Sequence, residues 1–353
     1  MKKEQLYYFA ITSFVLFCVF VVNLLFAGRL VSKRVVSGVM EDVLKDPVVE
    51  EKSVTMIAVG DLMLGRTVET LMKREGDGYP FAKIGDLLRG YDIVFGNLEG
   101  PIPEQHVQTP LGGFRFNFRK EVVSLLKDQG FTVVSLANNH ALDFGQKGFE
   151  ETNHRLDAVG IGYVGHYSHE QYDVYEAEVR GKKIVMVAFN MIEPDFDERA
   201  ALAWALKAAK EIPHDVLLAS VHWGVEYENR AAPEVRKFAY GLIDAGVDVI
   251  LGGHPHVPQG IGVYKGKTII YSMGNFVFDQ YWSEPTQYGL AVAMTFDHEE
   301  IVLRLIPIDL HESQPRELEE SRQAAWFGVL AGYSDEEIQE AVRNGKIVQI
   351  RQR

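Results

Sequence analysis

Apolar and polar residues alternate along the chain in a pattern typical of a layered α/β protein. Short apolar runs rich in β-branched residues predict buried strands, and longer stretches with a 3.6-residue period predict amphipathic helices. The predicted strands are Val54–Val59, Ile93–Phe95, Thr132–Leu136, Ile161–Val164, Ile184–Ala188, Val216–Val221, Val247–Leu251 and Thr268–Ser272. The predicted helices are Phe81–Leu88, Lys120–Asp128, Gly148–Val159, Arg199–Lys210 and Glu234–Ala245. This alternation predicts sheets that are covered by helices.

The C-terminal part of the chain adds two features. Leu290–Phe296 and Ile301–Pro307 alternate around a polar turn and predict a hairpin that completes a second sheet. Further on, Ser334 and Glu337 form a capping box that opens a short helix. We interpret residues 313–353 as a peripheral, solvated helical appendage.

The chain begins with an uncharged apolar segment, Leu6–Ala27. This segment is long enough to cross about 30 Å of hydrocarbon as a helix, so it predicts a retained membrane anchor over residues 1–28. A cleaved signal peptide and an apolar core helix are the alternatives. Basic residues lie on both sides, so the positive-inside rule does not fix an orientation. Residues 29–52 predict a linker, which is followed by one globular domain over residues 53–312.

Charge and cysteine content narrow the classes of function. The formal net charge of −13 disfavours a nucleic-acid-binding surface, which needs a basic face. An anionic substrate would be repelled as well, so it must be held by a local positive centre such as metal ions. The only cysteine is Cys18, which excludes an intrachain disulfide and a cysteine-based metal site.

Side chains suited to metal binding follow most of the predicted strands. The clearest case is Val247–Leu251, which ends at two glycines and leads into His254 and His256. Glycine lets the backbone turn there, and a His-x-His pair can aim both imidazoles at one small volume. The corresponding residues after the other strands are Asp61, Asn97, Glu99, Asn138, Asn139, His140, His222, Glu226 and Asn275.

Each of these residues also has a structural explanation. Asp61 could cap a helix, the two asparagines after Leu136 could form a turn, and His222 could be a hydrogen-bonded core histidine. Taken together, however, they place carboxylate, amide and imidazole groups at strand ends, where ligands gather in layered α/β proteins. A cage of oxygen and imidazole ligands around one or two divalent ions accounts for all of them.

The chain resembles the CapA/PgsA family of poly-γ-glutamate capsule biosynthesis proteins, a branch of the calcineurin-like metallophosphatase superfamily. The resemblance lies in the order of the motifs GDLMLGR, GNLEGP, NNHALDFG, HWGVEY, GGHPH and YSMGNFVFDQ, and covers about residues 54–311. It extends to the N-terminal apolar segment. It implies a four-layer α/β/β/α sandwich of the metallophosphatase type, preceded by one transmembrane helix, with metals at the strand ends.

The same resemblance implies roles for individual residues. The metal ligands would be Asp61, Asn139, His222, His254 and His256, and His140 would protonate a leaving group. Metallophosphatases usually carry Asp-x-His and then Gly-Asp. This chain has Met63 in place of that histidine and Asn97 in place of the second aspartate. Glu99 lies on the same side of an extended segment as Asn97 and has the charge that a bridging ligand needs, so we assign Glu99 as a further ligand. The implied cofactor is a pair of divalent ions, Mn, Fe or Zn.

Four residues near these ligands are candidates for substrate binding. Arg66 could clamp an anionic group, with a surface salt bridge as the alternative. The other three are Asn97, Glu226 and Asn275.

The resemblance implies a membrane-anchored protein that acts in the synthesis or export of poly-γ-glutamate. The alternatives are an active metal-dependent phosphoesterase or amide hydrolase, and a non-catalytic scaffold that binds the polymer within the synthase complex. The expected partners are the anionic polymer or its intermediate, the membrane, and other membrane subunits of a capsule synthase. We expect the globular domain on the outer face of the cell membrane.

Overall fold

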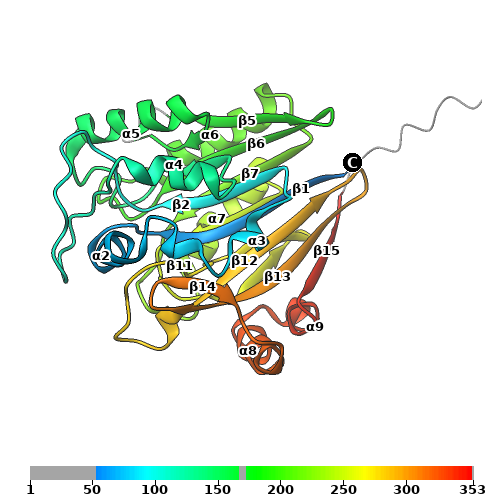
Figure 1. Cartoon of the computed structure of the whole chain (residues 1–353). Helices are drawn as coiled ribbons and strands as arrows, with labels where there is room; N and C mark the ends of the chain where they lie inside the picture. The colour runs from blue at the N-terminus through cyan, green and yellow to red at the C-terminus, as the bar shows by residue number, and fades with distance from the viewer. Residues whose placement is uncertain (1–52, 167–171, 352–353) are drawn as a thin grey trace, which may run out of the picture. The chain divides into compact units, whose positions relative to one another are not determined.

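Two β-sheets packed face to face form the centre of the protein (Figure 1). The computed structural model describes residues 53–166 and 172–351. Within these residues the first sheet has nine strands. Their order is β14 (Gln314–Glu317), β13 (Glu300–His311), β12 (Tyr288–Phe296), β1 (Val54–Leu62), β2 (Ile93–Leu98), β3 (Val133–Ser135) and β4 (Gly162–Val164), with β11 (Asn275–Val277) beside β1 and β15 (Lys346–Ile350) beside β13.

The second sheet has six strands in the described residues. Their order is β5 (Val174–Val179), β6 (Lys182–Asn190), β7 (Val216–His222), β8 (Val249–Gly253), β10 (Lys267–Ile270) and β9 (Ile261–Tyr264). In each sheet the central strands are parallel: β1 to β4 in the first, and β6, β7, β8 and β10 in the second. Parallel strands bring their carboxyl ends to one edge of the sheet, which is where the candidate ligands stand.

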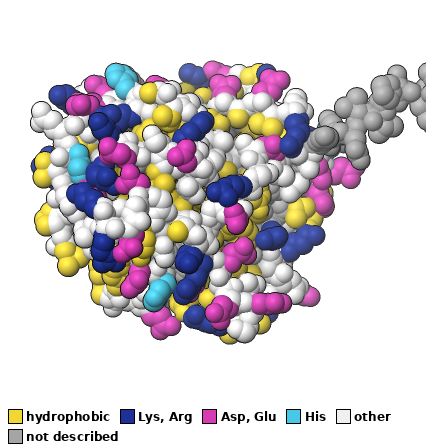
Figure 2. All heavy atoms as spheres, in the orientation of Figure 1, with side chains coloured by type: hydrophobic (Ala, Val, Ile, Leu, Met, Phe, Trp, Pro, Cys, Tyr) yellow, Lys and Arg dark blue, Asp and Glu magenta, His cyan; other side chains and the backbone are white. Residues whose placement is uncertain are grey.

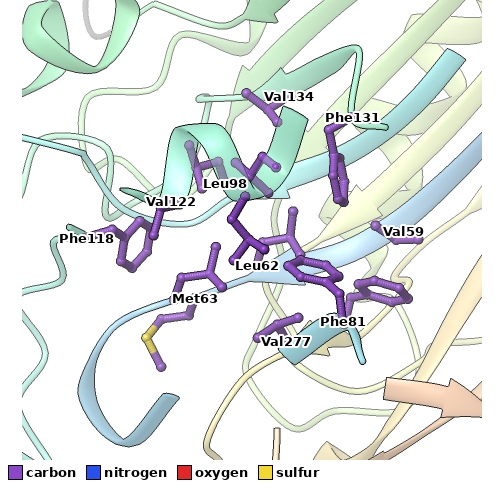
Figure 3. Packing of buried hydrophobic residues seen from close by; sticks show 14 of the residues in the cluster. Val59, Leu62, Met63, Phe81, Leu98, Phe118, Val122, Phe131, Val134 and Val277 are labelled. Atoms are coloured by element: carbon purple, nitrogen blue, oxygen red, sulfur yellow. The ribbon is translucent and has the colours of Figure 1, made fainter. Parts of the chain in front are cut away.

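Helices cover the outer face of the first sheet. They are α2 (Arg66–Glu75), α3 (Gly85–Leu88), α4 (Glu121–Asp128) and α5 (Gly145–Val159), together with the short 3-10 turn η1 (Tyr79–Phe81). Their apolar side chains form one buried cluster with the outward-facing residues of the sheet, such as Leu62, Leu98 and Val134. Figure 3 shows Phe81, Val122 and other members of this cluster packed around Leu62.

The outer face of the second sheet is covered by α6 (Glu198–Glu211) and α7 (Pro233–Ala245). Neighbouring residues of β8 show why its apolar run is continuous. Ile250 packs outward against these helices, while Val249 and Leu251 pack inward against the first sheet. Met56 of β1 and Leu218 of β7 belong to the same inner cluster. The predicted α/β sandwich with two sheets is therefore confirmed.

The prediction of a peripheral appendage over residues 313–353 is wrong for the part that the structure describes. β14 and β15 both pair with β13 in the first sheet. α8 (Glu320–Tyr333), the 3-10 turn η3 (Glu336–Ile338) and α9 (Gln339–Arg343) connect them. Phe327, Leu330 and Val342 from this segment are buried in the cluster between the sheets. Residues 52–353 form one compact unit, and the described members of the three apolar clusters all belong to it, so this part of the chain contains its own core.

Other segments differ less from expectation. The helix predicted over Phe81–Leu88 is two short pieces, η1 and α3, and the break falls before Gly85, the weakest helix former in the segment. The predicted anchor over residues 1–28 and linker over residues 29–52 lie outside the described residues. None of the helices in residues 53–166 and 172–351 combines the length and apolarity that a membrane crossing requires.

The integration of β15 leads to a stability prediction. Ile347 is 4% exposed in the inter-sheet core, whereas Ile350 on the same strand is 65% exposed. We expect Ile347→Ala to lower the free energy of unfolding by about 2–5 kcal/mol, and Ile350→Ala to change it by less than about 0.5 kcal/mol. Urea unfolding of both variants measures this difference. Equal and small effects of the two substitutions would support a peripheral appendage.

Candidate metal centre

The polar residues predicted at the strand ends converge on one buried place between the two sheets. Asp61 lies near the end of β1, Asn97 near the end of β2, and His222 at the end of β7. Glu99, Asn139 and His140, and His254 and His256 follow β2, β3 and β8. An oxygen of Asp61 accepts a hydrogen bond from the backbone N–H of His254 at 3.3 Å, which joins the two sheets at this point.

Asp61, Glu99 and His256 form the first group of possible ligands. One ligand atom from each lies within 4.8 Å of the others, and all three residues are buried. His256 Nδ1 is 3.4 Å from Asp61 Oδ2, and its Nε2 is 3.8 Å from Glu99 Oε1. Glu99 Oε1 is buried and receives no hydrogen bond from the described residues. A buried carboxylate oxygen without a donor fits a cation, because such an atom is otherwise costly to desolvate.

Asn139, His222 and His254 form the second group. His222 Nε2 and Asn139 Oδ1 are 2.9 Å apart. The rings of His222 and His254 have centroids 4.9 Å apart. His254 Nδ1 is buried without a hydrogen-bond partner among the described residues. The two imidazoles and the amide oxygen of this group make a donor set that suits Zn, Fe or Mn.

Asn97 lies between the two groups. Its Nδ2 donates to Asp61 Oδ1 at 2.8 Å and lies 3.3 Å from His222 Nδ1. Its Oδ1 accepts from Asn138 Nδ2 at 3.0 Å, which fixes the orientation of the amide. Asn97 therefore links the first group to the second, at the position where the resemblance leads us to expect a bridging aspartate.

The backbone at the end of β8 and just after it passes close to other parts of the chain. A Cβ on Gly252 would lie 2.0 Å from the carbonyl oxygen of Tyr271, and a Cβ on Gly253 would lie 2.8 Å from Asp61 Oδ1. Both following histidines have positive φ, 94° for His254 and 60° for His256. Positive φ costs a non-glycine residue free energy, and it persists where the surrounding structure holds it, often at functional sites.

The two groups also differ in their electrostatics. Burial, followed by the charge of Asp61, raises the pKa of Glu99 well above its ordinary value. Burial alone would lower the pKa of His256, but Glu99 and Asp61 outweigh it and raise this pKa to about 9. Burial and neighbouring histidines lower the pKa of His254 to about 4, and that of His222 well below its ordinary value. Glu99 and His256 therefore retain a proton that a cation would displace, and the second group is neutral and able to coordinate.

His140 lies beside the first group and is held from two sides. Its Nε2 is 4.0 Å from Glu99 Oε1. Its Nδ1 is 2.8 Å from Asp143 Oδ2, and its ring stacks on Phe116 with centroids 3.9 Å apart. Asp143 Oδ2 also accepts from the backbone N–H of Phe116 at 2.5 Å. The histidine predicted to donate a proton is thus oriented by a carboxylate and an aromatic ring.

The candidate substrate-binding residues have different surroundings. Arg66 is only 4% exposed and forms a buried ion pair with Asp279, so its surroundings differ from the surface salt bridge that was the alternative. Asn275 is buried, and its Oδ1 lies 3.0 Å from His256 Nδ1, so it orients that ring. Glu226 is exposed on the loop after β7. Asn97, described above, is buried among the ligands.

Sequence reasoning missed Asp143 and Asp279 as parts of the site. Asp143 comes three residues after His140, a spacing at which one turn of chain brings two side chains together, so a signal was present. Asp279 gave no such signal, because its partner Arg66 is 213 residues away in sequence.

Residues 55–280, which include every residue of the two groups, match the family described as "Bacterial capsule synthesis protein PGA_cap". The chain belongs to this family. Its relatives among bacterial capsule synthesis proteins include "Capsule biosynthesis protein CapA" of Bacillus anthracis, which is 31% identical over 288 residues, 76% of this chain and 70% of that protein. "PGA biosynthesis protein CapA" of Bacillus subtilis is 34% identical over 283 residues, 73% of this chain and 72% of that protein.

A more distant relative of this capsule synthesis protein comes from Mycobacterium tuberculosis. It is described as a "probable polyglutamine synthesis accessory protein" and is 26% identical over 286 residues, 64% of this chain and 74% of that protein.

The raised pKa values lead to a prediction for the metal-free protein. The folded state holds more protons than the unfolded state between the ordinary pKa of His256, 6.5, and its folded value of about 9. Stability must therefore fall as pH rises through this window. Urea unfolding of chelator-treated protein at several pH values measures the slope. We expect His256→Gln to flatten it, and a rise of stability with pH in the wild type would contradict the assignment.

Proposed function

We propose that this capsule synthesis protein is anchored to the cell membrane and acts on poly-γ-glutamate, through a divalent-metal site, during synthesis or export of the polymer. The observation that carries the proposal is the convergence of ligand atoms from Asp61, Glu99 and His256 within 4.8 Å, all of them buried. The polymer enters from the printed names of the relatives, which refer to PGA and polyglutamine synthesis. The anchor rests on the uncharged segment Leu6–Ala27.

The site would hold two ions in unlike surroundings. Asp61, Glu99 and His256 offer a carboxylate-rich set, which favours Mn or Fe, and Asn139, His222 and His254 offer a nitrogen-rich set, which also suits Zn. The fold supports this assignment, because helices on both outer faces of two packed sheets give the layer order of a metallophosphatase sandwich.

The chemistry that we propose is hydrolysis or transfer at an anionic substrate. Bound divalent ions would supply a Lewis acid that polarises a substrate oxygen and lowers the pKa of water. His140 would donate a proton from Nε2 to the departing oxygen or nitrogen, while Asp143 holds Nδ1 and so keeps the ring in place. Local positive charge in the site would also offset the overall net charge of −13, which repels a polyanion.

A non-catalytic scaffold is the second candidate, and one observation favours it. Asn97 is neutral and lies between the two groups of ligands, where its amide is already bonded to Asp61 and Asn138. A neutral amide is a poorer bridge between two cations than a carboxylate. A site that binds metal without turnover would hold the nascent polymer or organise the membrane subunits of the synthase.

Metal content tests the ligand assignment. After incubation with Mn²⁺ and desalting, we expect elemental analysis to give about two ions per chain for the wild type. Glu99→Gln and His254→Gln should each lose about one ion, because they belong to different groups. His106→Gln is a matched control, since His106 contacts Glu69 and Asn117 outside the site. Unchanged metal content in both ligand variants would contradict the assignment.

Turnover separates the two candidates. With Mn²⁺ bound, we expect hydrolysis of a phosphodiester or of γ-glutamyl oligomers, and we expect His140→Gln to lower kcat by about 10²-fold or more without loss of metal. His106→Gln should leave kcat unchanged. Two results together would favour the scaffold. The fully metallated wild type would hydrolyse neither substrate, and Asp61→Asn would nevertheless abolish polymer production in cells.

A further inference from the structure

Exposed apolar side chains gather on loops that follow the strands near the metal centre. In residues 53–166 and 172–351, seven large hydrophobic side chains are more than half exposed. Five of them stand on loops at the carboxyl edge of the sheets: Val107, Leu111, Phe114, Val225 and Trp282. We call these five the apolar collar. Figure 2 shows apolar atoms along the left edge of the molecule, where Figure 1 places α2 and the loop after β2.

Hydrogen bonds join the loops of the apolar collar into one surface. Arg66 donates to the carbonyl oxygen of Gly113, next to Phe114, at 3.3 Å. The same guanidinium forms the buried ion pair with Asp279, which lies three residues before Trp282. Gln280 of that second loop donates to the hydroxyl of Tyr227 at 3.5 Å. Tyr227 belongs to the loop after β7 that carries Val225, so all three loops are connected.

The composition of the apolar collar does not suit the polymer. A poly-γ-glutamate chain carries a carboxylate on each residue, and basic side chains would recognise it, whereas the apolar collar consists of Val, Leu, Phe and Trp. Exposed aromatic and aliphatic side chains on loop tips are typical of surfaces that enter the interface of a lipid bilayer. Leu111 is 81% exposed, Phe114 77% and Trp282 64%, so these side chains have no other cover in the described residues.

The segment that precedes the described domain is long enough to let the apolar collar reach a bilayer. Residues 29–52 follow the apolar segment and, when extended, can reach about 80 Å. They join the domain at Ser53, before the amino end of β1, while the apolar collar lies at the carboxyl edge. β1 has nine residues and therefore spans about 30 Å. The linker is long enough for the carboxyl edge to turn toward the membrane in which the anchor is held.

We propose that the apolar collar inserts into the interface of the lipid bilayer and holds the carboxyl edge of the sheets, where the metal centre lies, against the membrane surface. This inference rests on the membrane anchoring in the proposed function. It assigns a direction to the site: a polymer that leaves a membrane-embedded synthase meets the metal centre before it meets bulk water. Arg66 then has a role in place of anion binding, because it clamps the loops that carry Phe114 and Trp282.

Vesicle binding by the domain without its anchor tests the proposal. Residues 53–353 contain all three apolar clusters, so this piece is the appropriate protein. We expect it to sediment with phosphatidylcholine vesicles, and we expect Leu111→Ser/Phe114→Ser to weaken this partition by about tenfold or more. Val329→Ser/Ile350→Ser is the control, because these two apolar side chains are also more than half exposed, 57% and 65%, but lie outside the apolar collar.

Trp282 provides a second readout in the same samples. It is one of four tryptophans in the chain, and the emission that Trp282→Phe removes should shift to shorter wavelength when vesicles are added. Vesicles that also contain phosphatidylglycerol should bind the domain less well at low salt, because anionic lipid repels the acidic domain and the binding itself comes from insertion of apolar side chains. The proposal would be overturned if the wild type did not sediment with vesicles, or if the control variant lost as much vesicle binding as the collar variant. The apolar collar would then be assigned to a protein partner instead of the bilayer.

The metal content of each sample keeps the two proposals apart. The collar variants should retain the metal stoichiometry of the wild type, since none of the changed side chains is a ligand. Vesicle binding by a protein that binds no metal would support the proposal for the apolar collar and contradict the metal centre. Metal binding by a protein that does not bind vesicles would support the metal centre and contradict the proposal for the apolar collar.

Discussion

Asp61 carries the constraint on which the site depends, because its buried carboxylate touches both sheets. One oxygen accepts from Asn97 of the first sheet at 2.8 Å, and the other accepts from the backbone N–H of His254, after β8 of the second sheet, at 3.3 Å. A carboxylate that is taken out of water must be compensated by donors, by opposite charge or by a cation. The polar residues at the other strand ends therefore lie around Asp61, where they help to compensate its buried charge.

This requirement also explains the unusual backbone at the end of β8 and just after it. Gly252 and Gly253 let the chain pass close to Tyr271 and Asp61, and His254 and His256 then adopt positive φ. Such a conformation is stable only when the gain from the side chains exceeds its cost. Glu99 Oε1 and His254 Nδ1 make no hydrogen bond to any of the described residues, so they indicate where the protein's own groups do not complete this compensation. A cation at each of these atoms would complete it.

Much of this could be predicted from the sequence. Apolar runs located the central strands, and the residues that follow them, from Asp61 to His256, are the ones that meet in space. Long-range pairings could not be predicted, because Arg66 and Asp279 have no pattern that links them. The C-terminal part was misjudged for a related reason. β15 is short and alternates between buried and exposed residues, so only its pairing with β13 shows that it belongs to the first sheet.

The central claim is that donors from both sheets hold divalent cations at this place. Anomalous diffraction from crystals of the Mn²⁺-soaked protein tests it most directly. The account predicts one peak within coordination distance of Asp61, Glu99 and His256, and a second near Asn139, His222 and His254. Mn²⁺ peaks found only at surface carboxylates, with none in this buried site, would contradict it.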